Sequence, residues 1–410
     1  MLLKTQNTEA RRTCWRCKCL LIAHVADTHL GYMQYNLEER FEDFNDAFRE
    51  VVDKAINEHV DVLVHAGDAF HDPRPSIKAL KFFREQLRRL HSRGIPVIAV
   101  PGSHDMLKRR GMPPLSLFDD LGLKLLTFAT PSAEVKGIFF GGFQYLPRHR
   151  HDSIIAKLRE IEIEAREKGG KKILVLHQAL EHLLPIAYEI SLAELPKNFS
   201  YYAMGHIHSH HVIPYGKGVL SYPGSTEVLS VDEIKHIDDK GFNIVDLSGD
   251  EPIIHRVRIE SVRPQLRYKS SAEELLALAE KIRKEIVSAK ALKKPLIHVE
   301  VTSEVDRFTY EKVEKLLQPF CLKVRIARKI EEEGYITTTV TELESISVEQ
   351  AIAEYLKIKG LGDKEVSIAI EILRTLSLGN LTEKEAVART IEEIEHIFGV
   401  KSGESKEDRA

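Results

Sequence analysis

Five short apolar runs, each closed by an aspartate or a histidine or followed closely by one, constrain the fold of this chain more than any other feature. The runs are CLLIAHVAD (19–27), VDVLVHAGD (60–68), IPVIAVPGS (95–103), KKILVLHQA (171–179) and FSYYAMGH (199–206). Apolar runs of about five to eight residues bounded by Gly, Pro or Asp are typical of strands that are buried on both faces. We therefore expect these segments to form the strands of a buried sheet.

Amphipathic segments with helical spacing separate these runs. RFEDFNDAFREVVDKAINE (40–58) repeats its apolar residues every three or four positions, and SIKALKFFREQLRRLHSRG (76–94) ends at Gly94, a residue suited to a helix C-terminus. The alternation of strands and helices indicates an α/β fold with a layered core. Further strands are expected at 136–142, 217–224 and 241–247.

The length of 410 residues favours two to three domains, at about 150 residues per domain. The α/β alternation fills residues 20–250. Residues 251–340 contain the strand-like segments IIHRVRIES, PLIHVEV and CLKVRIAR together with two helical segments, which predicts a small α+β domain. Residues 346–400 contain three amphipathic helical segments, and the polar residues 401–410 are expected to be a disordered tail.

Residues 1–19 form a polar, basic extension that we expect to have little order. Its Cys14, Cys17 and Cys19 lack the second pair of ligands that a structural zinc site usually has. No apolar run approaches the roughly 20 residues that span a bilayer, and the N-terminus lacks the apolar segment of a signal peptide. We therefore expect a cytoplasmic protein with no membrane partner.

The charge balance excludes a histone-like polycation, because 59 Lys and Arg stand against 62 Asp and Glu for a net charge of −3. It leaves room for a local basic groove, since net charge describes only the average field. The 19 histidines direct attention to metal sites. His24 and His65 lie inside strand runs, where we expect them to be core residues rather than ligands.

Candidate ligands follow the five strand runs in order: Asp27 and His29, Asp68, His104 and Asp105, His177, and His206 with His208. The carboxyl ends of strands in an open α/β sheet converge on one edge. Aspartates and histidines gathered there are costly to bury unless cations lie between them. Mixed Asp and His ligation suits Mn²⁺, Fe²⁺ or Zn²⁺. Six or more ligands exceed the needs of one ion, whereas two ions about 3.5–4 Å apart drive in-line phosphoryl displacement.

The ordered motifs D-x-H, G-D, G-x-H-D, H and G-H-x-H resemble those of calcineurin-like metallophosphoesterases. The longer strings DTHLGY, EERFEDFNDAF, AGDAFHDPRPS, ELPKNFSYYAMGHIH, YPGSTE and VRIESVRP resemble archaeal double-strand-break repair nucleases of the meiotic-recombination-eleven type, relatives of bacterial SbcD. The resemblance is strong over 20–265 and general over 266–340. It implies a layered β-sandwich flanked by helices, with 251–340 as a DNA-capping domain.

The resemblance also implies roles for individual residues. Two Mn²⁺ ions per subunit are expected, the first held by Asp27, His29 and His208, the second by His177 and His206, with Asp68 bridging them. His104 would contact the scissile phosphate and assist the leaving group, Asp105 would orient the His104 imidazole, and His71 would also touch the phosphate.

Ser103 departs from the family pattern, which usually has Asn before the catalytic histidine. A serine hydroxyl reaches less far than an Asn amide. Two interpretations stay open: Ser103 or a water completes the shell of the second metal, or the second site is weaker and nuclease activity is reduced.

DNA contacts are expected from basic clusters and from the YPGSTE loop. The residues are Lys108, Arg109 and Arg110, then Arg256, Arg258 and Arg263, and Ser225 in the loop. Such side chains contact phosphates without reading sequence, although a basic cluster is also compatible with a solvated surface.

Two partners are implied by the resemblance besides DNA ends. A homodimer is expected through a face around Phe82, Phe83, Leu115, Leu117 and Phe118, which are equally compatible with the core. A zinc-hook SMC-like ATPase is expected on the helices of 346–400.

The leading hypothesis is a manganese-dependent DNA nuclease, a 3′–5′ exonuclease and single-strand endonuclease, associated with the nucleoid in break repair. Exonuclease polarity rests on the resemblance and cannot be read from the residues. The alternatives are a calcineurin-like phosphomonoesterase or cyclic-nucleotide phosphodiesterase, and a DNA-end scaffold with weakened catalysis.

Overall fold

The computed structural model describes residues 20–106, 111–289, 292–328, 362 and 365–370. The chain divides into two units, Met1–Lys329 and Ile330–Ala410. In the second unit the described residues 365–370 are helical. The expectations for the extension 1–19, for Lys108, Arg109 and Arg110, for most of the helices of 346–400 and for the tail 401–410 lie outside the described residues.

A six-stranded sheet carries the first three apolar runs. Its strand order is β12-β11-β1-β2-β3-β4, and β1 to β4 run parallel while β11 pairs antiparallel with both β1 and β12. The strands are β1 (Leu21–Val25), β2 (Val62–His65), β3 (Val97–Ala99), β4 (Leu123–Leu125), β11 (Gly241–Asp246) and β12 (Ile253–Arg258). The parallel strands put the ends of the first three runs on one edge.

A second six-stranded sheet carries the fourth and fifth runs, with the order β5-β6-β7-β8-β10-β9. Strands β6, β7, β8 and β10 are parallel, and β5 and β9 are antiparallel edges. The strands are β5 (Ser132–Val135), β6 (Ile138–Phe143), β7 (Lys172–His177), β8 (Tyr201–Gly205), β9 (His211–Tyr215) and β10 (Gly218–Tyr222).

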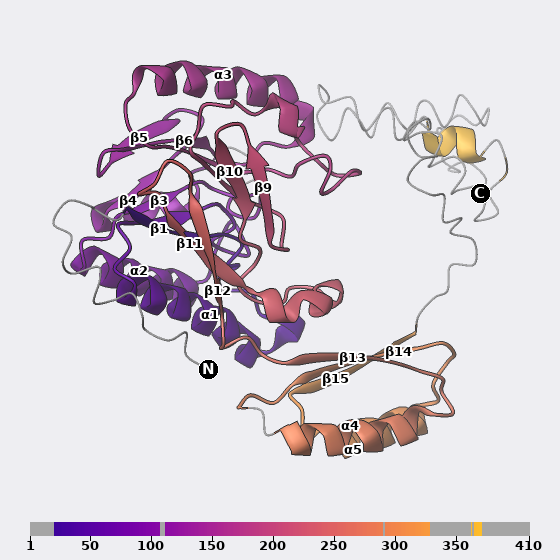
Figure 1. The fold of residues 1–410 in the computed structure, drawn as a ribbon. Coiled ribbons are helices and arrows are strands. Elements are labelled where there is room, and N and C mark those ends of the chain that lie inside the picture. Colours follow the sequence, from indigo (N-terminus) through magenta and orange to yellow (C-terminus); the bar gives the residue numbers. More distant parts are fainter. Residues whose placement is uncertain (1–19, 107–110, 290–291, 329–361, 363–364, 371–410) are drawn as a thin grey trace, which may run out of the picture. The chain divides into compact units, whose positions relative to one another are not determined.

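The two sheets pack face to face, with helices outside them (Figure 1). Alternate side chains of one strand enter different cores: Ile22 of β1 lies between the sheets, whereas Ala23 packs toward α1 (Glu38–Asn57) and α2 (Ile77–Ser92). Helix α3 (His151–Glu167) covers the outer face of the second sheet. Burial on both faces explains the unbroken apolar runs. The predicted layered α/β sandwich is confirmed.

A smaller parallel sheet follows, with the order β13-β14-β15. Its strands are β13 (Gln265–Ser270), β14 (Leu296–Val301) and β15 (Lys323–Arg328), and it packs against α4 (Leu275–Ala289) and α5 (Arg307–Leu317). The segment 253–258 was expected in this second region, but as β12 it pairs with β11. Its Ile254 and Val257 pack against the two cores of the sandwich, which fixes it there.

Short 3₁₀ helices complete the described elements: η2 (Gln34–Asn36), η3 (Pro114–Leu121), η4 (Arg148–Arg150), η5 (Leu192–Glu194) and η6 (Val231–Asp239). Phe83, Leu115 and Phe118 are core residues beneath α2 and η3, whereas Leu117 is 58% exposed. Three of the five apolar residues expected on the dimer face are therefore buried in the core of the chain itself.

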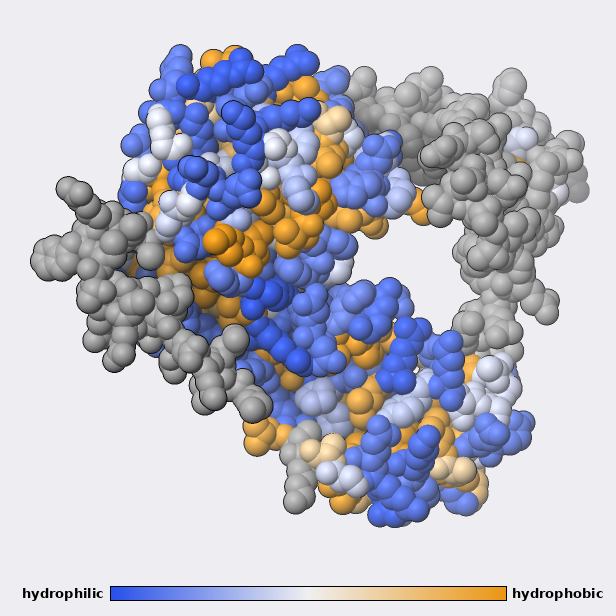
Figure 2. Space-filling view, viewed as in Figure 1, coloured by the Kyte–Doolittle hydropathy of each residue, from blue (hydrophilic) through white to orange (hydrophobic). Residues whose placement is uncertain are grey.

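Hydrophilic residues cover most of the surface on the face shown in Figure 2, and apolar residues lie on it in scattered groups. Scattered apolar side chains are ordinary on a folded surface. Among the described residues, no helix combines the length and the apolar character needed to cross a membrane.

Candidate dinuclear metal centre

Both sheets deliver polar side chains to one site. Asp27 and His29 follow β1, Asp68 follows β2 and Ser103 to Asp105 follow β3, all in the first sheet. His177 ends β7, and His206 and His208 follow β8 in the second sheet. The convergence predicted from strand ends is present, although the ends come from two facing sheets rather than one.

Two groups of ligands result, and each contains residues of both sheets. In one group Asp27, His29 and His208 have potential ligand atoms within 4.8 Å of one another, and in the other Asp68, His177 and His206 do. The groups adjoin, because His29 Nε2 lies 3.8 Å from Asp68 Oδ2 and His177 Nε2 lies 4.0 Å from Asp27 Oδ1. This spacing suits two neighbouring cations that share a carboxylate.

The backbone at these strand ends is strained. Positive φ angles occur at Asp27 (54°), His29 (43°), Asp68 (53°) and His206 (90°), a region that non-glycine residues seldom adopt. Each such conformation costs on the order of 1–3 kcal/mol and persists where the surrounding structure imposes it. The four residues belong to the two ligand groups, and no feature of the sequence predicts their backbone strain.

Two glycines allow the loops to approach this closely. A Cβ on Gly205 would lie 1.9 Å from the carbonyl oxygen of Ala66, and a Cβ on Gly102 would lie 2.1 Å from Asp68 Oδ1. Any side chain at either position would push the strand ends apart.

Imidazole orientation leaves nitrogen lone pairs facing the centre. His177 Nδ1 donates to the carbonyl oxygen of Ala66 at 2.8 Å, which directs the buried Nε2 inward. His29 Nε2 and His177 Nε2 are both buried and make no hydrogen bond among the described residues, although His177 Nε2 lies 3.3 Å from Asp68 Oδ2. Buried polar atoms without partners are rare, so these nitrogens fit the coordination of a metal ion.

Burial and close charges shift the pKa values of several residues of the centre. Burial raises the pKa of Asp27. Burial acts in the same direction on Asp68, but His177 beside it outweighs burial and holds the pKa of Asp68 well below its ordinary value. Despite its own burial, the pKa of His177 is raised to about 10 by Asp68, whereas burial and His177 lower the pKa of His206 to about 3. Buried carboxylates in this setting are stabilised by positive charge.

Asp105 does not bond to the His104 imidazole, which corrects the role expected for it. Its carboxylate accepts hydrogen bonds from the backbone N–H groups of Ala69 (3.1 Å), Phe70 (3.0 Å) and Gly102 (2.9 Å). Burial and the charge of Asp68 raise the pKa of Asp105 to about 6. Asp105 therefore ties the loop after β2 to the loop after β3.

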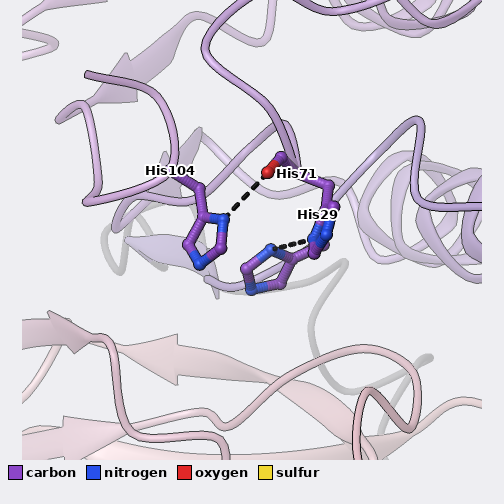
Figure 3. A group of neighbouring side chains, drawn as sticks. All are labelled: His29, His71 and His104. Carbon is purple, nitrogen blue, oxygen red and sulfur yellow. Dashed lines mark hydrogen bonds between the residues drawn. The ribbon is translucent and has the colours of Figure 1, made fainter. Parts of the chain in front are cut away.

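His104 is oriented by the backbone of His71. Its Nδ1 donates to the His71 carbonyl oxygen at 2.8 Å, as the dashed line in Figure 3 shows. A carbonyl can only accept, so Nδ1 carries the proton and Nε2 is left for chemistry. The His71 ring also lies 3.4 Å from His29 between Nδ1 atoms and stacks on Tyr32, with ring centroids 3.7 Å apart. The structure brings His29, His71 and His104 together as one group.

Ser103 reaches the second group. Its hydroxyl donates to Asp68 Oδ2 at 3.3 Å, and its side chain is half-buried. The hydroxyl lies beside the carboxylate shared by the two groups.

Two residues expected to contact DNA are buried instead. Arg263 bonds to Asp43 and is 7% exposed, and Ser225 is fully buried and bonds to the Glu227 carbonyl. Neither side chain is presented on the surface, which argues against the DNA contacts expected for them. Arg256 is half-buried against Asp239, while Arg258 is exposed and pairs with Asp238.

Two carboxylate residues and one tyrosine near the centre belong to no motif that the sequence analysis identified. Glu233 accepts a hydrogen bond from His208 Nδ1 at 3.0 Å, Glu189 Oε1 lies 3.9 Å from His206 Nε2, and Tyr145 donates to Glu189 at 3.2 Å. They lie outside the strand-end motifs and reach the site only through folding. In contrast, His24 and His65 are core residues, as predicted, bonded to Tyr201 and Thr28.

Comparison with known proteins identifies the class first. Residues 20–210 match the family model described as calcineurin-like phosphoesterase, and that segment contains all of the candidate ligands. The fold and the paired ligand groups are those of a metallophosphoesterase, a hydrolase of phosphate esters.

The particular family follows from full-length relatives. The chain is similar to the DNA double-strand break repair protein Mre11 of Methanococcus maripaludis (33% identity, covering 82% of this chain and 90% of the relative). Similar coverage is found for Mre11 of Methanocaldococcus jannaschii (32%, 85% and 93%) and of Sulfurisphaera tokodaii (31%, 94% and 98%). The chain belongs to the Mre11 family of DNA double-strand break repair proteins and is an enzyme of the phosphodiesterase, or nuclease, class.

Proposed function

We propose that this chain is a manganese-dependent DNA nuclease that processes the ends of double-strand breaks, with 3′–5′ exonuclease and single-strand endonuclease activity. The observation that carries the proposal is the pair of ligand groups beside His104 in a chain of the Mre11 family. Mixed Asp and His ligands suit Mn²⁺, and a pair of ions about 3.5–4 Å apart suits in-line displacement at a phosphodiester.

The ligand sets divide between two ions. Asp27, His29 and His208 would hold one Mn²⁺, while His177 and His206 would hold the other, with Asp68 shared and Ser103 beside the second. When bound, the two ions would polarise the phosphate and lower the pKa of the attacking water.

The chain's own residues would supply positioning and proton transfer. His104 is exposed, its ring centroid lies 4.9 Å from that of His29, and its Nδ1–H is held by the His71 carbonyl. Its Nε2 is therefore the nitrogen that would take up a proton, forming the imidazolium, and would pass that proton to the leaving oxygen. The His71 ring, held against Tyr32, would contact the phosphate from the adjoining side.

The remaining partners are part of the same proposal. The domain built on β13 to β15 would cap DNA. Contacts to the DNA backbone would come from Arg256, Arg258 and residues 108–110. The chain would act as a homodimer in the cytoplasm, at the nucleoid. A zinc-hook SMC-like ATPase would bind the helices of 346–400. Deleting 346–410 is expected to abolish co-purification of the ATPase while manganese-dependent cleavage persists; retained binding would contradict this assignment.

The central test is cleavage of a DNA hairpin with and without Mn²⁺. His104→Ala is expected to lower the rate by about 10²–10⁴-fold, the usual contribution of a general acid, while both Mn²⁺ ions still bind. His91→Ala, which removes an exposed histidine on α2, is the matched control and is expected to leave the rate unchanged. Hydrolysis of p-nitrophenyl phosphate without DNA cleavage would favour a phosphomonoesterase instead.

A further inference from the structure

A half-buried carboxylate lies behind one candidate metal ligand. Glu233, on η6, accepts a hydrogen bond from His208 Nδ1 at 3.0 Å, and its side chain is 15% exposed. On its other ring nitrogen, His208 Nε2 lies 3.8 Å from Asp27 Oδ1. His208 therefore stands between a carboxylate of the candidate centre and a carboxylate behind it.

The Glu233 carboxylate is fixed by a second set of contacts. Its Oε2 accepts from Lys240 Nζ at 2.5 Å, from Ser225 Oγ at 3.2 Å and from the Leu229 N–H at 3.3 Å. Lys240 is almost fully buried and also donates to the His208 carbonyl oxygen at 3.3 Å. Oε2 therefore faces the ammonium of Lys240, while Oε1 accepts from His208 and from Ser230 Oγ at 3.2 Å.

The other histidine ligands are supported differently. His177 Nδ1 donates to a neutral carbonyl, that of Ala66, and His29 Nδ1 lies against His71 Nδ1. For His206, the carboxylate of Glu189 lies 3.9 Å from Nε2, beyond hydrogen-bond distance. Among the described contacts of the four candidate histidine ligands, the hydrogen bond from a ring nitrogen to a carboxylate outside the two ligand groups is that of His208 to Glu233.

We propose that Glu233 is a positioning residue that sets the affinity of one of the two metal sites, the site of Asp27, His29 and His208. The Glu233 carboxylate accepts from Lys240 on one oxygen and from His208 on the other, so it holds the His208 proton on Nδ1, fixes the ring and raises the basicity of Nε2. Ser225 and Lys240 act behind it by holding the carboxylate in place. The inference rests on the proposed function and adds an asymmetry: the site with the anionic support is the tighter one.

Calorimetric titration of the metal-free full-length chain with Mn²⁺ tests the inference. The wild type is expected to bind two ions in two resolved steps. Glu233→Gln is expected to weaken one step by about 10–100-fold, the usual effect of losing such a partner, and to leave the other unchanged. The Mn²⁺ concentration that half-activates cleavage is expected to rise similarly, with kcat recovered at saturating Mn²⁺.

Matched variants separate positioning from folding. Glu233→Gln leaves Lys240 buried without its carboxylate, so the double variant Glu233→Gln/Lys240→Met removes that charge as well and is expected to show the same loss at one site. Glu194→Gln alters a comparable pair outside the centre, in which Glu194 lies 2.9 Å from His151 Nε2, and is expected to leave both steps unchanged.

The outcomes distinguish the two proposals. Two unchanged steps in a folded Glu233→Gln chain, or equal weakening of both, would overturn the inference while the proposed function stands. Absence of any Mn²⁺ binding by the wild type would overturn the proposed function and the inference with it.

Discussion

The carboxylate of Asp105 is bonded to backbone amides on two loops, and the imidazole of the adjacent His104 is held by the carbonyl of His71. The two residues are consecutive in sequence, yet their side chains have different roles. Asp105 holds together the loops that carry Asp68 and His104, while His104 faces outward with Nε2 free. The orienting group for His104 is therefore a backbone carbonyl that a sequence motif cannot reveal.

Asp105→Asn is expected to lower the free energy of unfolding. Two carboxylate oxygens accept three backbone N–H bonds, and an amide NH₂ would face one of those donors without accepting from it. A buried donor without a partner costs about 1–3 kcal/mol, which urea denaturation would measure. If stability is unchanged and only the rate of cleavage falls, Asp105 would be acting on the imidazole after all.

Ser103→Asn is expected to tighten the metal site of Asp68, His177 and His206. The serine hydroxyl now donates to Asp68, whereas an Asn amide reaches further and offers an oxygen ligand. Mn²⁺ titration should show tighter binding at one step, with faster cleavage at limiting Mn²⁺. An unchanged titration and rate would show that serine, alone or through water, already suffices.

Gly205→Ala is expected to disrupt both stability and metal binding. Its Cβ would be forced to 1.9 Å from the Ala66 carbonyl, and overpacking of this kind costs about 1–3 kcal/mol. The displaced loop carries His206, so Mn²⁺ affinity should fall as well. Gly169→Ala is the control, because its Cβ would meet nothing within 4 Å. Equal melting temperatures for the two variants would contradict the crowding at Gly205.

Asp43 is expected to make the protein sensitive to acid. Burial would raise the pKa of Asp43, but hydrogen bonds from Arg263 and Lys293 and the charge of Arg40 outweigh burial and hold it below the ordinary value. A lowered folded-state pKa stabilises the fold above the unfolded value of about 3.9, and this stability is lost as the pH falls through the folded pKa.

Unfolding by urea between pH 3 and pH 7 checks this expectation. Asp43→Asn is expected to cost about 3–5 kcal/mol at pH 7, because it leaves buried cations unpaired, and to flatten the acid side of the profile. Asp238→Asn, at an exposed pair with Arg258, is expected to change stability by less than about 1 kcal/mol. Parallel acid profiles for wild type and Asp43→Asn would contradict the role of Asp43.

Local sequence patterns predicted the elements that are buried on both sides. The runs at 21–25, 62–65 and 172–177 are strands because their side chains meet apolar layers above and below. Strand β13, QLRYKS, was missed, since four of its six residues are polar. Strand β12 was assigned to the wrong sheet, because the partner of an edge strand depends on tertiary packing.

The site shows the same limit. Ligand identities follow from strand ends, where chemistry and secondary structure coincide at Asp27, Asp68 and His177. Arg263 illustrates the opposite case, since a basic residue in a basic stretch is in fact buried on Asp43. The role of Glu233 could not be predicted from the sequence, because the hydrogen bond between Glu233 and His208 joins residues 25 positions apart and forms only after folding.

The division of each ligand group between the two sheets has a consequence for the whole sandwich. Asp27 and His29 come from one sheet and His208 from the other, and Asp68 likewise faces His177 and His206. An ion held by either group would be coordinated by residues of both sheets and would link the two sheets to each other. Its affinity would then be a measure of how firmly the layers hold together, and chelation would loosen the scaffold along with the chemistry.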